Sequence, residues 1–440
     1  MFALDTSTHA VSTLNFISLF PLNDSCYMQT DKTRLNDLQE WLLVHGRKLL
    51  SQPPADWKYL TRPQLSMLEQ QAALRVRSRH RFPEPEQWLW SDRSLAQASD
   101  WRSACFKASL FPRRAEVLDG CCGAGADAVA LAARGAVCAI DSDPWMTALA
   151  VSNADAHGLS LATRTINLDS SAMGEAQWLH VDPDRRPGNR KTLIADQFSP
   201  PLQDVLLLAN RTRGYAIKLA PSTLFELDLT HWIAEHCVRV WLGGHCECRQ
   251  QLLIGNEVQD NLARNLGLHE AVSQRHAIAI LLTDGSARLA TALEPSNWNC
   301  FAAPANCESA SEETNVDQFI FDLHPTLHVS GLALAWAHQQ NLYPISGEHG
   351  YYTGSQSVPG PWAQSFQVMD VIAWDDRKIR KWLKQNQVGQ VEVKCRMVTM
   401  NANDFQRRYS KPEGRPVTLL VTRIGDRVRA IAAERLQPVH

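Results

Sequence analysis

The sequence lacks the features that would assign it to a membrane, secreted or metal-binding class. No run approaches the roughly 18 consecutive apolar residues that a membrane-spanning helix needs. The eleven cysteines are an odd number spread over 440 residues, which does not suggest a disulfide framework. The segment HCEC at residues 245–248 would supply part of a zinc site, but no second Cys or His pair completes four ligands. We therefore expect neither a bound metal nor a membrane.

The N-terminal stretch LNFISLFPL also lacks the basic leader and the small-residue cleavage site of a signal peptide. The sequence therefore predicts a cytoplasmic protein.

Charge is nearly balanced over the whole chain but not along it. A formal net charge of −2 gives no global sign of nucleic-acid binding. From Val371 to His440, however, 15 Lys and Arg residues stand against 7 Asp and Glu residues. A basic C-terminal segment is a weak indication of a polyanionic partner.

Apolar spacing predicts helices in the first quarter of the chain. Residues 34–50, 61–79 and 94–106 have helical periodicity, with Leu65, Leu68, Ala72 and Val76 as one apolar stripe. The sequence before them has no sustained period. We predict a flexible extension over residues 1–30 and a helical N-terminal domain over residues 31–112.

From Glu116 onward, short apolar runs alternate with helical segments, which is typical of a parallel sheet. The predicted strands are Val117–Leu118, Val137–Ile140, Thr163–Ile166, Trp178–Val181, Tyr215–Leu219, Val238–Leu242 and Ala277–Leu282. The sequence therefore predicts an α/β, Rossmann-like domain of about seven strands over residues 113–290.

A polar, strand-poor segment over residues 291–315 is typical of a linker. After it, FQVMDVIAW, DDRKIRKWLKQNQ and VGQVEVKCRMV predict a strand, a helix and a strand. NDFQRRY predicts a short helix, and PVTLLVTRI with RVRAIAA predicts a hairpin. We therefore expect a separate α+β domain over residues 316–440.

The stretch VLDGCCGAGADA carries the clearest functional signal. Small residues after the first strand let the backbone turn sharply and approach a ligand, and the helix that begins near Ala126 points its N-terminus at the same place. About twenty residues after Asp119, Asp141 ends the second strand, where a carboxylate can accept the hydroxyls of a ribose. The pattern predicts a site for a ligand that carries a nucleoside.

The identity of that ligand follows from the acid that precedes the turn. A carboxylate at Asp119 suits a cationic amino-acid group better than a pyrophosphate, which favours S-adenosylmethionine over a dinucleotide. The segment resembles the first motif of class I methyltransferases. The resemblance implies a cofactor site made of the turn, the ribose acid and an acid near the adenine amine, namely Asp119, Cys121, Gly123, Gly125, Asp141 and Asp169. A Rossmann-like domain without a ligand is the alternative reading.

The segment HVDPDRRPGNRKT follows the fourth predicted strand. Methyltransferases that act on nucleic-acid bases carry an (N/D)PP-aromatic motif there, which makes Asp182 and Pro183 the candidate catalytic residues. This chain has Asp184 in place of the second proline, and no aromatic ring follows. Arg185 and Arg186 could hold a phosphate or a carboxylate, although a solvated loop is the simpler reading. Lys218, at the end of the fifth strand, should face the same crevice.

Taken together, DGCCGAGADA, DPDRR, DQFSPPL, IKLAP, ECRQ and VEVKCRMV resemble one bacterial family of methyltransferases. Its members are related to trimethylguanosine synthase and carry a C-terminal THUMP-like domain. The resemblance covers residues 60–434, with alanine at position 126 and aspartate at position 184 as departures. THUMP domains elsewhere bind RNA, so the resemblance implies RNA as a partner. Lys394 and Arg396 share one face of a predicted strand and are candidate RNA contacts, or plain surface.

The sequence therefore predicts an S-adenosylmethionine-dependent methyltransferase that modifies a base in structured RNA, such as tRNA or rRNA. Two other functions remain open: a methyltransferase of a small anionic substrate, and a non-catalytic RNA-binding protein. The methylated atom, the RNA target, the general base and the oligomeric state do not follow from the sequence.

Overall fold

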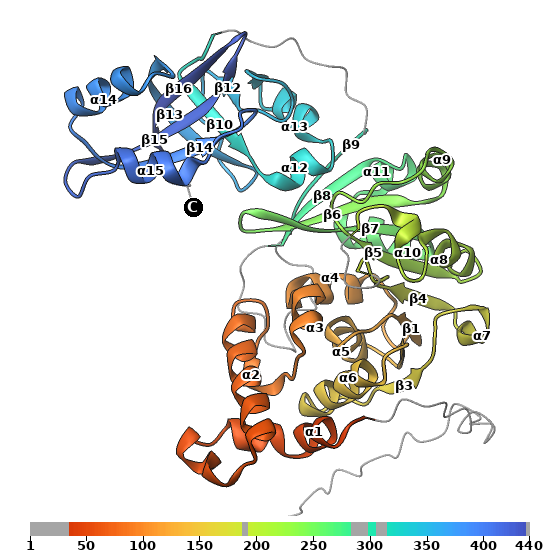
Figure 1. Ribbon diagram of the computed structural model, residues 1–440. Helices are drawn as coiled ribbons and strands as arrows, with labels where there is room; N and C mark the ends of the chain where they lie inside the picture. The colour runs from red at the N-terminus through yellow and green to blue at the C-terminus, as the bar shows by residue number, and fades with distance from the viewer. Residues whose placement is uncertain (1–34, 187–191, 283–297, 305–314, 437–440) are drawn as a thin grey trace, which may run out of the picture.

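The computed structural model describes residues 35–186, 192–282, 298–304 and 315–436. The predicted extension over residues 1–30 lies outside the described residues. The chain forms N-terminal helices, a central sheet with helices on both faces, and a second sheet with its own helices (Figure 1). No helix in these ranges is long and apolar enough to cross a bilayer.

The first helices are α1 (Asp37–Leu50), α2 (Arg62–Ser78), α3 (Asp92–Gln97) and α4 (Trp101–Ser109), with short 3₁₀ turns at Pro54–Tyr59 and Pro85–Gln87. The prediction of one helix over residues 94–106 was wrong, because α3 ends at Gln97 and α4 begins anew at Trp101. Asp100 caps α4 by accepting a hydrogen bond from the Ser103 amide at 3.2 Å. The break brings the segment between the helices to the edge of the central sheet.

The apolar stripe predicted for α2 was also partly wrong. The helix buries Leu68 and Leu74, whereas the Val76 side chain is 59% exposed. The helix buries Gln71 rather than Val76. The Gln71 side-chain amide donates a hydrogen bond to the Trp90 carbonyl and accepts one from the Trp90 amide. A polar residue whose hydrogen bonds are satisfied can occupy a core position that periodicity assigns to an apolar one.

Within the described residues, the central sheet has nine strands in the order β3-β2-β1-β4-β5-β7-β6-β8-β9. The strands are β1 (Val117–Gly120), β2 (Val137–Asp141), β3 (Ala162–Thr165), β4 (Trp178–Val181), β5 (Gly214–Leu219), β6 (Val238–Gly244), β7 (Glu247–Asn256), β8 (Ala277–Leu282) and β9 (Trp298–Ala303). All neighbours pair in parallel except where β7 or β9 takes part. The seven predicted strands are present, and β7 and β9 were missed. The strand β9 lies within the predicted linker, which corrects that prediction for these residues.

Helices cover both faces of this sheet and bury two separate cores. The helices α5 (Ala126–Ala132), α6 (Pro144–Ala156) and α10 (Glu257–Leu266) share one core with α4. The helices α7 (Ser170–Met173), α8 (Leu202–Ala209) and α9 (Leu227–His236) bury the other. A 3₁₀ turn at Ala195–Gln197 and the short helix α11 (His269–Ser273) complete this part.

The second sheet has the order β11-β12-β10-β13-β16-β15-β14. Its strands are β10 (Phe319–Leu323), β11 (Tyr343–Pro344), β12 (Tyr352–Gly354), β13 (Ala363–Ala373), β14 (Val388–Cys395), β15 (Arg415–Ile424) and β16 (Arg427–Arg435). The helices are α12 (Pro325–Val329), α13 (Ala333–Gln339), α14 (Asp376–Gln385) and α15 (Ala402–Tyr409). The predicted strand-helix-strand unit and the hairpin of β15 and β16 are both present.

The two sheets share one apolar core through α12 and α13, which Figure 1 shows between them. Trp241 and Leu281 of the central sheet cluster with Phe321 and Leu327 of the second unit. At the same junction His324 Nε2 lies 2.9 Å from the carbonyl oxygen of Gly244. The second unit is therefore packed against the β6–β7 hairpin.

Candidate active site

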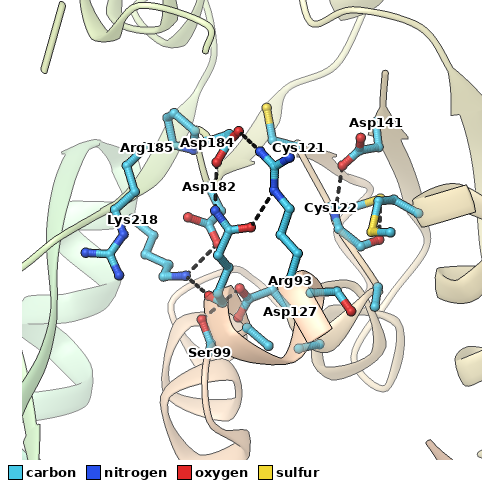
Figure 2. Close-up of a pocket in the computed structure, with 18 of the residues that line it drawn as sticks. Arg93, Ser99, Cys121, Cys122, Asp127, Asp141, Asp182, Asp184, Arg185 and Lys218 are labelled. Carbon is cyan, nitrogen blue, oxygen red and sulfur yellow. Dashed lines mark hydrogen bonds and ion pairs between the residues drawn. The ribbon is translucent and has the colours of Figure 1, made fainter. Parts of the chain in front are cut away.

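A cavity of about 720 Å³ opens at the carboxyl ends of the central strands (Figure 2). Its walls come from the turn after β1, from the ends of β2, β4 and β5, and from the start of β7. The break between α3 and α4 closes one side, so the N-terminal helices form part of the site. Ligands of open α/β sheets bind at this edge, where the strand order reverses.

The turn after β1 is shaped for close approach of a ligand. Gly123 has a φ of +54°, and a Cβ atom built there meets nothing within 4 Å. Its amide donates a hydrogen bond to Asp141 Oδ2 at 2.9 Å, and the Asp143 amide donates to Asp141 Oδ1 at 3.0 Å. Burial raises the pKa of Asp141, although both amides favour its charged form. Asp141 is therefore held in place beside the turn, on the cavity wall.

These residues fit an adenosine that carries an amino-acid group. Cys121, Gly123 and Asp141 all line the cavity, and Asp141 offers two carboxylate oxygens to a ribose. Ile140, Met146, Ile166, Asn167 and Leu168 line the adjoining wall, which is mostly apolar as a purine ring requires. Gly125 lies outside the wall, but its φ of +85° and its contact with α6 set the path of the turn.

Asp119 is not part of the cavity wall, contrary to the sequence prediction. It pairs in register with His180 of β4, and its Oδ1 lies 2.6 Å from His180 Nδ1, with both side chains buried. Burial raises the pKa of Asp119, and His180 opposes that rise. The Asp119 side chain projects from one face of the sheet beside His180, where both side chains are fully buried, and it does not reach the cavity.

Asp169 is likewise not on the wall. Its Oδ1 accepts hydrogen bonds from the amides of Ser171 and Ala172, at 2.8 and 2.9 Å, and so caps α7. The hydroxyl of Ser171, which also donates to Oδ1 at 2.6 Å, lowers the pKa of Asp169 most, and the two amides lower it further. The two preceding residues, Asn167 and Leu168, line the cavity wall instead of Asp169.

Asp182 and Pro183 line the cavity at the end of β4, as the sequence predicted. Lys218 Nζ lies 2.5 Å from Asp182 Oδ2 and donates a second hydrogen bond to the Gln97 carbonyl at 2.9 Å. The Asp182 side chain keeps 27% of its surface exposed. One carboxylate oxygen is thus fixed by an ammonium group while the residue still faces the cavity.

Asp184, the departure from the family motif, has a structural role. Its carboxylate accepts hydrogen bonds from Arg93 Nη2 at 2.5 Å and from Gln97 Nε2 at 2.7 Å. Both partners belong to α3. Asp184 therefore ties the loop after β4 to the N-terminal helices, as the dashed lines in Figure 2 show.

The two adjacent arginines differ in position. Arg185 lines the cavity, and its guanidinium makes no hydrogen bond to any described residue; burial lowers its pKa. Arg186, the second candidate for holding a phosphate or a carboxylate, is not on the wall. The backbone amide of Arg186 donates to Asp184 Oδ1, and its carbonyl accepts from Arg93, so it belongs to the loop that Asp184 anchors.

Lys394 and Arg396 lie on β14 and just after it, outside the cavity. The Lys394 ammonium lies 2.5 Å and the Arg396 guanidinium 2.6 Å from the Asp322 carboxylate of β10. Three strands separate β10 from β14 in the sheet order, so the sheet must curve to bring them together. These two cations are paired within the second unit and do not form the open surface that we expected.

The sequence reasoning missed several wall residues. Ser99, Asp127, Arg249 and Gln250 line the cavity, and Lys107 lies behind them. The ECRQ segment contains two of them, but its sequence indicates no more than a family resemblance. Asp127 is the one missed residue that the sequence could have indicated, because it is an acid within the glycine-rich segment DGCCGAGADA.

The HCEC segment forms the turn and the start of β7, where Cys246 is exposed and Cys248 is half-buried. In the described part of the chain, no group of three or more potential metal ligands comes together.

Comparisons with known proteins agree with this geometry. The THUMP domain-like family matches residues 363–435. Two proteins of Mycobacterium tuberculosis, from strains CDC 1551 / Oshkosh and H37Rv, are each 25% identical over 77% of this chain and 86% of their own length. Both are described as uncharacterized S-adenosylmethionine-dependent methyltransferases. This chain is a homologue of these methyltransferases and ends in a THUMP-like domain.

A crystal structure of a candidate methyltransferase from Porphyromonas gingivalis W83 has the same fold. It covers 92% of this chain and 100% of its own length, with a TM-score of 0.67 and 17% identity. The predicted class I methyltransferase fold is thereby confirmed, and the THUMP-like domain contains β13 to β16. S-adenosylmethionine is the cofactor named for the curated relatives, and the cavity residues suit it.

Proposed function

We propose that this protein is an S-adenosylmethionine-dependent methyltransferase that modifies a base in structured RNA. The observation that carries the proposal is the position of two acids on either side of one turn. Asp141 ends β2 and Asp182 follows β4, β1 lies between these strands, and both acids line the same cavity. The cavity thus offers a ribose acceptor and a substrate acceptor within one enclosure.

When bound, S-adenosylmethionine supplies an electrophilic methyl group on a positively charged sulfur. The residues of this chain orient the substrate and take up its proton. Lys218 holds Asp182 Oδ2, which leaves Oδ1 to accept a hydrogen bond from a base nitrogen. A nitrogen that gains a methyl group must lose a proton, and Asp182 aligns its lone pair or accepts that proton. The ring of Pro183 restricts the backbone that presents Asp182.

Exposed cations on the C-terminal domain support RNA as the substrate class. The side chains of Arg377, Lys378, Lys381 and Lys384 are exposed on α14. Arg407 and Arg408 are exposed on α15, where they pair with Asp404 and Asp376. Tyr409 of α15 donates a hydrogen bond to Asp376 of α14 at 3.1 Å, so the two helices lie side by side. We call the four exposed cations of α14, namely Arg377, Lys378, Lys381 and Lys384, the basic face. Clustered cations of this kind bind phosphate backbones without reading the sequence.

Methyl transfer from labelled S-adenosylmethionine to RNA tests the proposal. The RNA should come from cells that lack the gene, so that the target sites are unmodified. We expect incorporation of label into one RNA fraction by the wild type and a loss of incorporation in Asp182→Ala. The matched control is Asp204→Ala, an identical change at an exposed position on α8, which should behave as the wild type.

Two results would contradict the proposal. If the wild type labels no RNA fraction but labels a small anionic metabolite, the substrate class is wrong. If Asp182→Ala retains full activity, the chemistry assigned to the end of β4 is wrong.

A further inference from the structure

One end of the cavity is closed by polar side chains from three elements that lie far apart in the chain. Ser99 comes from the break between α3 and α4, Asp127 from the first turn of α5, and Gln250 from β7. Figure 2 shows Ser99 and Asp127 side by side, next to the Asp182 and Lys218 pair. The chemistry proposed above uses none of these three residues.

A buried ion pair fixes this cluster. Lys107 is 1% exposed, its Nζ lies 2.6 Å from Asp127 Oδ1, and it donates a hydrogen bond to Ser99 Oγ at 2.7 Å. Ser99 in turn donates to Asp127 Oδ2 at 3.0 Å. Burial alone would raise the pKa of Asp127, but Lys107 lowers it to about 2. The carboxylate is therefore charged at neutral pH and rigidly oriented on the wall.

Gln250 supplies an amide donor without a partner. The residue is 2% exposed, and its Oε1 lies 3.3 Å from Ser99 Oγ. Its Nε2 is buried and donates to no described atom. A buried donor without an acceptor is destabilising, so a ligand oxygen that accepts from it gains the full value of that hydrogen bond.

The cluster thus combines an ionised carboxylate, whose charge Lys107 balances, with an unused donor. Few small groups match both; an α-amino acid does, because it carries an ammonium donor and a carboxylate acceptor on one carbon. Asp119, which the sequence suggested for the ammonium, lies in the core and pairs with His180. Asp127 offers a carboxylate on the cavity wall in its place.

We propose that Ser99, Asp127 and Gln250 form the subsite for the zwitterionic amino-acid end of the cofactor. Asp127 accepts from the ammonium group, Gln250 Nε2 donates to the carboxylate, and Ser99 bridges the two residues. This inference rests on the proposed function, since it assigns one end of the same ligand. It predicts that the cavity selects nucleosides that carry the amino-acid end over those that do not.

The test is calorimetric titration of the full-length protein with two ligands. S-adenosylhomocysteine carries the amino-acid end, whereas 5′-methylthioadenosine shares its adenine, ribose and sulfur but lacks that end. Gln250→Glu replaces the donor with a negative charge opposite the ligand carboxylate. We expect it to weaken S-adenosylhomocysteine binding by about 10- to 100-fold and to leave methylthioadenosine binding within about twofold.

Ser99→Ala is a second variant, in case Gln250→Glu does not fold. It should weaken S-adenosylhomocysteine binding less than Gln250→Glu does, and it should likewise leave methylthioadenosine binding nearly unchanged. Gln274→Glu makes the same charge change at an exposed position and should bind both ligands as the wild type does. If Gln250→Glu weakens both ligands equally, or neither, the subsite is overturned while the methyltransferase assignment stands. If the wild type binds neither ligand, the proposed function fails and the subsite fails with it.

Discussion

Two cations of the cavity, Lys218 and Arg93, are used in the opposite way from the cations of the basic face. In the cavity, Lys218 and Arg93 each contact a carboxylate at 2.5 Å. On α14, Lys378, Lys381 and Lys384 are exposed and form no ion pair with any described residue. Paired charges are held at fixed positions and can orient a reacting group, whereas exposed, unpaired charges attract a polyanion over a distance that salt shortens. Burial and pairing, more than the number of charges, therefore decide what each cation can do.

The strongest effect should follow from removing the charge of Asp182, the acid that pairs with Lys218 in the cavity. Asp182→Asn keeps the shape of the side chain but removes the charge that accepts a proton. We expect the rate of methyl transfer to fall by about 100- to 10,000-fold. Single-turnover kinetics with labelled cofactor measures this, and cofactor affinity measured in parallel should change little. A loss confined to cofactor affinity would show that Asp182 only shapes the cavity.

The next effect concerns the backbone of the turn after β1, which forms part of the cavity wall. A Cβ atom on Gly125 would lie 2.8 Å from Ala150 Cα, and the φ there is +85°. We expect Gly125→Ala to lower the free energy of unfolding by about 2–4 kcal/mol, from left-handed strain and overpacking together. Chemical denaturation checks this value. Gly158→Ala is the control, because its Cβ meets nothing within 4 Å although its φ is +69°. Equal losses in the two variants would show that packing against α6 plays no part.

A substitution of Asp322 tests whether its ion pairs with Lys394 and Arg396 stabilise the fold. Burial alone would raise the pKa of Asp322, but Arg396 and Lys394 lower it below its ordinary value. A carboxyl with a lowered pKa stabilises the fold above pH ~4, and that stability is lost as the pH falls below this value. We expect Asp322→Asn to lower the free energy of unfolding at pH 7 by about 1–3 kcal/mol, because both cations keep some solvent contact. Denaturation across pH 3 to 7 should show a shallower acid limb for the variant.

The smallest effect should come from the basic face. Replacing Lys381 and Lys384 together by alanine should weaken RNA binding a few-fold, because each lysine neutralises a phosphate only weakly. The slope of log affinity against log salt should fall by about 1 for each phosphate that no longer pairs with a lysine. The matched comparison is Lys394→Ala, which should lower stability but leave that slope unchanged. If Lys394→Ala lowers the slope instead, the distinction between paired and exposed cations fails.

Much of the central sheet could be predicted because its strands are short apolar runs. Trp178–Val181 and Ala277–Leu282 match the predicted bounds. The strand β7 was missed because it starts with the polar residues ECRQ and follows β6 after a tight turn. The strand β9 was missed because most of its side chains are only half-buried at the sheet edge. Edge strands and hairpins therefore depend on pairing that local sequence does not reveal.

The candidate site was predicted only in outline for a related reason. Asp141, Asp182 and Lys218 lie at strand ends, so their position at the sheet edge follows from the strand pattern. The burial of Asp119 depends on His180, which lies 61 positions away and meets it only through strand register. The cluster of Ser99 and Gln250 depends on the break between α3 and α4, which periodicity did not predict.

Binding of S-adenosylmethionine in the cavity beside Asp141 underlies the proposed function and the amino-acid subsite alike. Calorimetric titration of the wild type and of Asp141→Ala tests it, with Asp155→Ala, an exposed acid on α6, as the control. We expect one saturable site in the wild type and the control, and an affinity at least about tenfold weaker in Asp141→Ala. Equal affinity in all three proteins, or no binding to the wild type, would contradict this assignment of the cavity.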